Sequence, residues 1–183
     1  MYIFAGSPIG LWPLSSQYKG ADLSGNGNGI TLVGTSFADN AVVFAGTTSS
    51  YGKISASPSL QLQQQFTWMA EYYPDSDKVG PLFDYFVQGE WGLHIWYNNR
   101  KLFVRPSYHG ASTPPEAQST TPLVTQQWNK IGLSIDSEVG VIKMIVNGAE
   151  DRFEKSEWIG NISHTDGNVF VSSVYVSCDY VLM

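Results

Sequence analysis

Turn-forming residues interrupt this chain of 183 residues at short intervals, and the segments between them are too short for ordinary helices. Each segment either alternates apolar with polar residues or runs apolar, as β-strands do. Many strands without intervening helices cannot form a parallel sheet, so antiparallel pairing follows. The clearest expected strands are 41–44, 51–54, 66–73, 81–87, 91–97, 101–106, 128–135, 141–146 and 169–176.

Composition agrees with this interpretation. Trp, Tyr and Phe make up 14% of the chain and charged residues another 14%, a balance that favours sheets. The net charge is −6 without any Lys/Arg cluster, which removes the attraction that nucleic acids and anionic membranes depend on. We therefore expect no nucleic-acid partner. No apolar run approaches the roughly 18 to 20 residues that span a bilayer, so membrane insertion is not expected either.

Local turn chemistry predicts two hairpins and one long loop. Asn147-Gly148 is the strongest hairpin signal and predicts a return strand over 149–153. Asn98-Asn99 predicts a second hairpin, because Asn tolerates the positive φ that tight turns need. Residues 107–122 are rich in Pro, Ser and Thr and predict an exposed loop.

One domain over residues 1–183 is the default expectation for an all-β chain of this length. The first 14 residues are apolar but lack a basic region and contain two prolines, which indicates a first strand and not a secretion signal. Cys178 is the single cysteine, so no internal disulfide forms. We expect a buried thiol, and the alternative is a bridge to a second copy in a homodimer.

A series of short motifs begins with Gly10-Leu-Trp-Pro-Leu14 and Asp22-Leu-Ser-Gly-Asn-Gly-Asn28. The later motifs are Phe44-Ala-Gly46, Ser50-Tyr51, Phe66-Thr-Trp68, Gly80-Pro-Leu-Phe83, Trp91-Gly92, Leu102-Phe-Val-Arg105, Trp128-Asn129 and Val146-Asn-Gly148. In this order they resemble the laminin G-like jelly rolls of the concanavalin A-like lectin and glucanase superfamily. The resemblance implies an all-β, antiparallel jelly-roll β-sandwich of two packed sheets in a secreted, extracellular protein. It implies fold more than function, because this fold carries receptors, adhesins, lectins and hydrolases.

The chain departs from the family pattern in two places. Ala45 stands where the family often has Asp, which removes a carboxylate that could support a metal site. Residues 172–183 follow almost directly on 169–171, where family members usually reach a last strand through another loop. A shortened connection and an atypical terminal strand both fit this departure.

Sugar recognition calls for an aromatic platform against the apolar face of a pyranose, with polar side chains for its hydroxyls. The segment 84–109 concentrates both kinds of residue. They are Tyr85, Trp91, His94, Trp96, Tyr97, Asn98, Asn99, Arg105, Tyr108 and His109. The alternative is that its rings fill the core, as a strand tryptophan in a sandwich more often does.

Strand alternation divides these residues between two faces. Leu93 and Ile95 share the face that is expected to pack in the core, which leaves His94 and Trp96 on an opposite, partly wet face. Arg105 faces the same side from the following strand. We therefore expect a ligand site made of His94, Trp96 and Arg105, with Asp84 and Asn98 as second choices.

A calcium site is the metal hypothesis. Ca²⁺ takes about six to eight oxygen ligands, commonly including two or more carboxylates. Asp75 and Asp77 lie two residues apart in a loop that Pro74 begins, which is compatible with a site on the rim that Asp84 or Asp136 would complete. One Cys and three scattered His give no basis for structural zinc.

Catalysis has little support in the sequence. A glycoside hydrolase needs two carboxyl groups about 5 to 9 Å apart across a cleft. The glucanases that the chain resembles supply them as Glu-x-Asp-x-x-Glu, and no such segment occurs here. An unusual pair, Asp84 with Glu71 or Glu90, would have to replace it.

The leading hypothesis is therefore a non-catalytic, lectin-like domain whose partner is an extracellular glycan or glycoprotein. The alternative is an adhesion module that binds a protein in a matrix or on a cell surface. Asn161-Ile-Ser163 is a glycosylation sequon, which suits a secreted protein.

Overall fold

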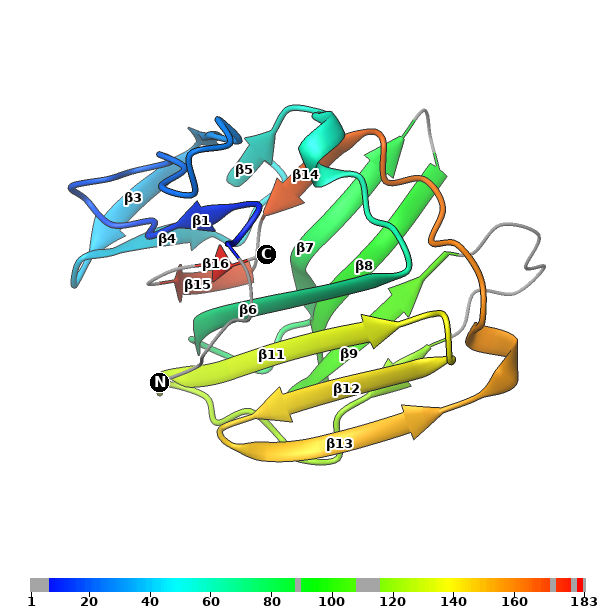
Figure 1. Cartoon of the computed structure of the whole chain (residues 1–183). Coiled ribbons are helices and arrows are strands. Elements are labelled where there is room, and N and C mark those ends of the chain that lie inside the picture. The colour runs from blue at the N-terminus through cyan, green and yellow to red at the C-terminus, as the bar shows by residue number, and fades with distance from the viewer. Residues whose placement is uncertain (1–6, 88–89, 108–115, 172–173, 179–180, 183) are drawn as a thin grey trace.

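The computed structural model consists of two antiparallel β-sheets that pack face to face (Figure 1). It describes residues 7–87, 90–107, 116–171, 174–178 and 181–182. For residues 90, 91, 174–178 and 181–182 it describes the backbone alone. The predicted all-β, antiparallel jelly-roll sandwich is confirmed.

The first sheet has nine strands and forms the front of the molecule in Figure 1. They are β1 (Leu11–Trp12), β3 (Thr35–Ala38), β4 (Ala41–Ala45), β6 (Gln65–Pro74), β11 (Asn129–Asp136), β12 (Val141–Val146), β13 (Ala149–Glu154), β15 (Val174–Cys178) and β16 (Val181–Leu182). Its main order is β13-β12-β11-β6-β15-β4-β3, and β16 pairs with both β6 and β1.

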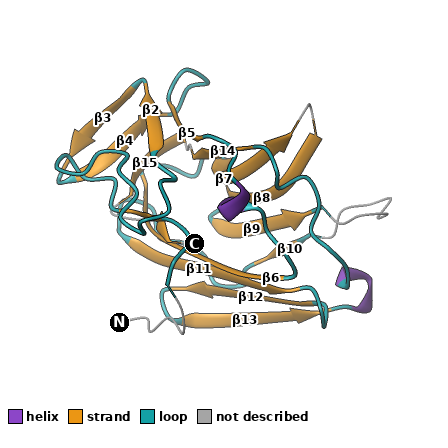
Figure 2. Cartoon of the chain, turned by 45° about the horizontal axis from the view of Figure 1, so that its top comes forward, coloured by secondary structure: helices purple, strands orange, loops and turns teal. Residues whose placement is uncertain are grey.

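The second sheet has seven strands in the order β10-β9-β8-β7-β14-β5-β2. They are β2 (Ile30–Val33), β5 (Tyr51–Ile54), β7 (Gly80–Val87), β8 (Glu90–Asn98), β9 (Lys101–Pro106), β10 (Ala117–Gln118) and β14 (Asn168–Val171). Figure 2 shows that the two 3-10 turns, η1 (Pro58–Leu60) and η2 (Ser156–Trp158), lie in connections outside both sheets. Within the described residues, no helix is long and apolar enough to span a bilayer.

Eight of the nine strands expected from the sequence are present, with bounds that differ by at most one residue. The ninth, 169–176, is wrong as a single strand. Its first part is β14 of the seven-stranded sheet and its second part is β15 of the nine-stranded sheet. The chain thus passes from one sheet to the other between Val171 and Val174.

The hairpin predicted at Asn147-Gly148 is confirmed: both residues have positive φ, 51° and 89°, between the paired β12 and β13. The second hairpin turns one residue later than predicted. Asn98 pairs with Lys101, and the turn residues are Asn99 and Arg100, with φ of 50° and 63°. Two positive-φ residues make the turn type whose twist suits adjacent strands.

Part of the predicted loop 107–122 is a strand, because β10 pairs with β9. Residues 108–115, with Tyr108 and His109, lie outside the described residues.

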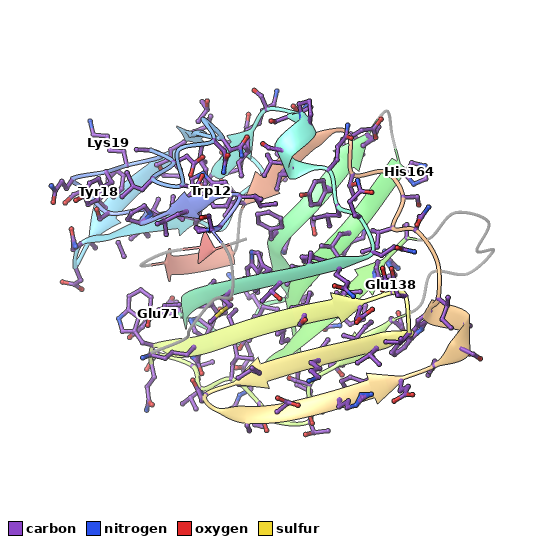
Figure 3. All side chains as sticks on the ribbon, in the orientation of Figure 1. Trp12, Tyr18, Lys19, Glu71, Glu138 and His164 are labelled. Atoms are coloured by element: carbon purple, nitrogen blue, oxygen red, sulfur yellow. The ribbon has the colours of Figure 1, made fainter. Side chains whose placement is uncertain are left out.

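Aromatic and aliphatic side chains fill the space between the sheets. Three tryptophans, Trp12, Trp68 and Trp158, are fully buried there. Figure 3 shows Trp12 inside the molecule, and Tyr18 and Lys19 on the periphery. Trp96 is only half-buried and Trp128 is 39% exposed, so not every tryptophan serves the core.

Candidate functional site

The candidate site lies on the outer face of the seven-stranded sheet, which is the sheet behind β6, β11, β12 and β13 in Figure 1. Leu93 and Ile95 of β8 are fully buried in the core. Strand alternation therefore turns His94 and Trp96 to the opposite face, and this predicted division is confirmed.

Six neighbouring strands each place one side chain in a row across this outer face. The pairing register aligns Thr31, Lys53, Phe170, Asp84, His94 and Arg105, in that order, from β2 to β9. Directly paired residues on one face lie close enough for their side chains to interact. The row therefore forms one continuous surface from segments that are far apart in the sequence.

Half-buried aromatic rings surround this row. The Phe170 ring packs edge-on against Tyr51, at 5.9 Å between centroids, and against Phe86 at 6.5 Å. The His94 and Trp96 rings are 5.9 Å apart, and Phe103 pairs with Trp96 across the strands. We call this surface the aromatic face; it consists of Tyr51, Lys53, Asp84, Phe86, His94, Trp96, Lys101, Phe103, Arg105 and Phe170.

Asp84 is the buried polar centre of the aromatic face, with 2% of its surface exposed. The Trp96 indole N–H donates to its two carboxylate oxygens at 2.9 and 3.0 Å. His94 Nδ1 lies 3.3 Å from the Asp84 carboxylate. Burial raises the pKa of Asp84 above its ordinary value, although the contacts with His94 and Trp96 act in the opposite direction. The carboxylate therefore fixes the orientation of the indole that lies above it.

The five residues predicted for the ligand site come from β7, β8 and β9. Asp84, His94, Trp96 and Arg105 lie together, and Trp96 and Arg105 are half-buried. His94 itself is only 3% exposed, because it packs beside Asp84 and Trp96, so Trp96 and Arg105 are the predicted residues that reach the surface. Asn98 lies at the end of β8, where its carbonyl accepts from Gln118.

Among the described residues, no third carboxylate joins Asp75 and Asp77, the pair proposed for calcium. Asp75 and Asp77 follow the end of β6, and Asp77 pairs with Arg100 at 3.6 Å. Asp136 pairs with Gln65 at the start of β6, ten residues of strand away. Figure 3 shows Glu71 of β6 and Glu138, which follows β11, on opposite sides of the molecule. Over the described residues, no group of three His, Cys, Asp or Glu is arranged to hold a metal ion.

The carboxylate pair Asp84 and Glu71, considered for hydrolysis, is separated by the whole sandwich. Glu71 follows the core residue Ala70 on β6 and contacts Lys130 at 3.7 Å on the outer face of the nine-stranded sheet. Asp84 lies on the outer face of the other sheet. The side chain of Glu90 lies outside the described part of the chain.

The motif Asp22 to Asn28 has a structural role. The Asp22 carboxylate accepts hydrogen bonds from the backbone N–H of Leu11, Ser24 and Asn28 and from the Ser24 hydroxyl. Burial alone would raise the pKa of Asp22, but these donors outweigh it and lower the pKa. The loop that this carboxylate holds borders an open polar pocket of about 420 Å³ with Ser55 to Ser57 on its other side.

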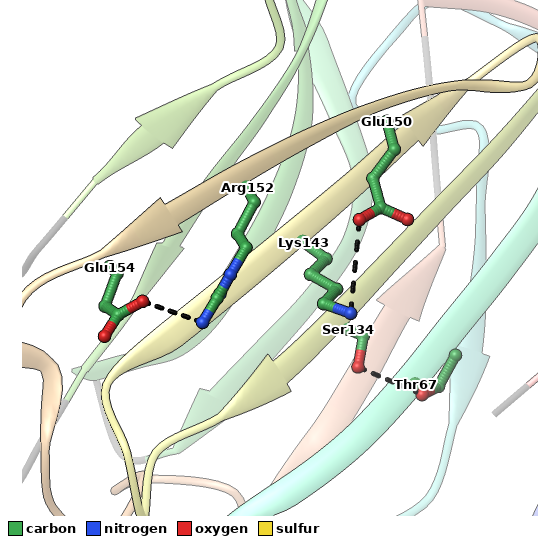
Figure 4. Close-up of polar contacts among 6 residues, drawn as sticks. All are labelled: Thr67, Ser134, Lys143, Glu150, Arg152 and Glu154. Atoms are coloured by element: carbon green, nitrogen blue, oxygen red, sulfur yellow. Dashed lines mark hydrogen bonds and ion pairs between the residues drawn. The ribbon is translucent and has the colours of Figure 1, made fainter.

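The outer face of the nine-stranded sheet has a different chemistry (Figure 4). Its charges pair with one another: Lys143 with Glu150 at 4.0 Å, and Arg152 with Glu154 at 2.7 Å. Exposed pairs of this kind are common on solvated sheet surfaces. A shallow apolar depression of about 70 Å³ lies there, lined by Gly132 and its neighbours.

Of the residues that β5, β7 and β14 contribute to the aromatic face, sequence reasoning found only Asp84. Tyr51, Lys53, Phe86 and Phe170 were not singled out. Alternation predicts which way each side chain points within its own strand. It does not predict that β14 pairs with both β5 and β7, and that pairing brings Phe170 beside Lys53 and Asp84.

The sequence matches no family model and no curated protein at a significant level. Among solved structures, the chain is similar to the binding domain of Paraclostridial Mosquitocidal Protein 1, with 14% identity and a TM-score of 0.75 over 96% of this chain and 48% of that one. It is also similar to the binding domain of Botulinum neurotoxin DC. The complex of that domain with rat synaptotagmin II gives 9% identity and a TM-score of 0.72, and the complex with SialylT gives 10% and 0.70.

Each of these two Botulinum neurotoxin matches covers 96% of this chain and 48% of the solved chain. The present chain thus spans about half the length of the domains that it matches. At these identities the likeness shows a shared β-sandwich fold and nothing finer. The resemblance to laminin G-like jelly rolls stays a prediction.

Proposed function

We propose that this protein is a lectin-like binding domain that recognises a glycan on the aromatic face, without chemistry on its ligand. One observation carries the proposal: half-buried aromatic rings and polar side-chain groups lie together on one surface of a sheet. A pyranose offers an apolar face to a ring and hydroxyl groups to the polar side chains around it. Trp96, Phe103 and Arg105 supply these contacts from β8 and β9.

The fixed position of Trp96 favours binding. Its indole donates to a buried carboxylate, so the ring holds one orientation before a ligand arrives. A side chain that is already ordered loses less conformational entropy on binding, and this gain appears as affinity.

The position of Asp84 argues for recognition and against hydrolysis. A glycosidase needs a second carboxyl group facing the first across the sugar. Asp84 is buried under Trp96, and the candidate partner Glu71 belongs to the other surface of the sandwich.

The solved binding domains of the same fold support a binding role, and one of them is a complex with SialylT. Another is a complex with a protein, synaptotagmin II, and it supports the alternative of an adhesion module with a protein partner. An extracellular setting belongs to this proposal, and the exposed Asn161 of the sequon is compatible with it. A homodimer bridged through Cys178 stays a prediction, since that side chain lies outside the described residues.

A glycan-array screen of the purified protein, in Ca²⁺ and again in EDTA, tests the proposal. We expect saturable binding to a related set of glycans in both buffers, because the aromatic face contains no calcium-type ligand cluster among its described residues. Loss of binding in EDTA would move the site to the rim at Asp75 and Asp77. No binding in either buffer by folded protein would place the protein-binding alternative first.

Two tryptophan variants locate the site. Trp96→Ala should weaken glycan binding at least about tenfold, since aromatic anchors carry much of the energy in binding sites. Trp128→Ala is the matched control: Trp128 packs against Tyr73 at 5.7 Å between centroids, away from the aromatic face, and its loss should leave binding unchanged. Phe170→Ala is a second test that leaves the hydrogen bonds of Asp84 in place.

A further inference from the structure

The cations of the aromatic face have no acidic partners. Lys53, Lys101 and Arg105 point outward, because they alternate with buried residues of β5 and β9. None of the three forms an ion pair within the part of the chain that the structure describes. Acidic residues outnumber basic ones in this chain, 16 to 10, so these three cations are not unpaired for lack of acidic residues.

Most of the other cations are paired. Arg100, Lys130, Lys143, Arg152 and Lys155 each contact a carboxylate. Among the described cationic side chains, the fourth one without a partner is Lys19, in the loop after β1. Three of the four unpaired cations thus gather on one sheet surface, the same surface that carries the aromatic rings.

Among the acidic side chains that the structure describes, the two nearest to this surface do not neutralise it. Asp84 is buried, and its oxygens are occupied by Trp96 and His94. Glu116 immediately precedes β10, whose Ala117 pairs with Val104, yet it makes no ion pair with Arg105. Within the described residues, the positive charge of the aromatic face therefore remains available to a ligand.

The spacing of the cations fits an extended ligand. Lys53 and Arg105 are four strands apart in the cross-strand row, which is about 19 Å at the usual strand separation. Lys101 and Arg105 lie four residues apart on β9, about 13 Å, with Phe103 between them. A single sugar ring does not reach across either distance, whereas an oligosaccharide does.

We infer that the ligand of the aromatic face is an acidic oligosaccharide whose carboxylate or sulfate groups pair with Lys53, Lys101 and Arg105. Its sugar rings lie against Trp96 and Phe103. This inference rests on the proposed function and deepens it, because it names the class of glycan. Arg is suited to this role, since its planar guanidinium binds carboxylate and sulfate-like groups through two parallel hydrogen bonds.

The test uses matched pairs of glycans: sialylated and desialylated N-glycans, and sulfated and desulfated heparin-derived oligosaccharides. We expect the acidic member of at least one pair to bind at least about tenfold more tightly than its neutral counterpart. That binding should weaken as NaCl is raised, because salt screens exposed charges. Equal binding of both members would overturn the inference and leave the proposed function standing. Binding of no glycan at all would overturn both.

Charge-removing variants assign the effect to the three cations. Lys53→Gln, Lys101→Gln and Arg105→Gln should each weaken binding of the acidic glycan, the last by about tenfold, and leave the neutral one nearly unchanged. Arg152→Gln, on the other sheet, is the matched control with the same change of charge. An equal loss in that control would contradict the inference. Vesicles with anionic lipid are the final arm: binding to them but to no free acidic glycan would also overturn it.

Discussion

The two outer faces of the sandwich are built from the same strand geometry but satisfy their polar groups in different ways. On the nine-stranded sheet, lysines and arginines meet glutamates at the surface, where water already solvates both partners. On the seven-stranded sheet, the acid is buried beneath an indole and the cations are left unpaired. The cations of the first face are already paired with carboxylates of the protein. The cations of the second face are free to pair with a ligand.

The largest effect that would separate the two faces is expected at Asp84. Asp84→Ala leaves the Trp96 N–H without its acceptor and removes the carboxylate beside His94. A buried polar group without a partner costs about 1–3 kcal/mol, so we expect a loss of about 3 kcal/mol in the free energy of unfolding. Urea denaturation followed by tryptophan fluorescence measures it.

Asp84→Asn is the control for that variant. Its amide oxygen can still accept from Trp96, and the buried charge is gone, so we expect stability within about 1 kcal/mol of the wild type. If the alanine variant were as stable as the asparagine variant, Asp84 would have no structural role under Trp96.

A smaller effect is the dependence of stability on pH. Burial raises the pKa of Asp84, so the folded protein holds this proton to a higher pH than the unfolded chain does. The contribution of Asp84 to stability is therefore greatest below the ordinary pKa of 3.8 and falls as pH rises through the raised value. Relative to Asp84→Asn, the wild type should lose stability over that window.

The measurement is the urea unfolding free energy of both proteins from pH 3.5 upward, compared as a difference. The difference in unfolding free energy could instead stay constant, or grow in favour of the wild type, as pH rises. Either result would show that contacts with Trp96 and His94 outweigh the effect of burial on the pKa of Asp84. The nine-stranded face offers no buried carboxylate of this kind among its described ion pairs, and it should contribute little to the difference.

The smallest effect is expected on the nine-stranded face. Lys143→Met or Glu150→Gln breaks an exposed ion pair whose side chains are about half exposed to water. Such pairs contribute less than about 0.5 kcal/mol, so the unfolding midpoint should hardly move and glycan binding should not change. A loss comparable to that of Asp84→Ala would show that the two faces do not differ as described.

The sequence predicted features that depend on neighbouring residues along the chain. It did not predict features that depend on contacts between distant strands. It predicted the Asn147-Gly148 hairpin and the outward direction of Trp96, because both depend on neighbours along the chain. It did not predict the burial of His94, which follows from the cross-strand contact with Asp84. It also did not predict that Phe170 belongs to the site, because that depends on β14 lying between β5 and β7.

The calcium hypothesis shows the same limit. Asp75 and Asp77 are neighbours in sequence, and that spacing alone suggested a ligand pair. In the structure Asp77 forms an ion pair with Arg100. Asp136 lies beside Gln65, at the other end of β6 from Asp75 and Asp77. A metal site depends on how carboxylates converge in space, and sequence spacing in a loop does not fix that convergence.

The central claim is that the outer face of the seven-stranded sheet, and not that of the nine-stranded sheet, binds the ligand. The most direct test is an NMR titration. The acidic oligosaccharides of the matched pairs are added to protein whose tryptophan indoles carry ¹⁵N, and the indole N–H signals are followed. Trp96→Phe and Trp128→Phe assign the two signals. We predict a saturable shift of the Trp96 signal with Trp128 unchanged; a shift confined to Trp128, or no shift in any indole, would contradict the account.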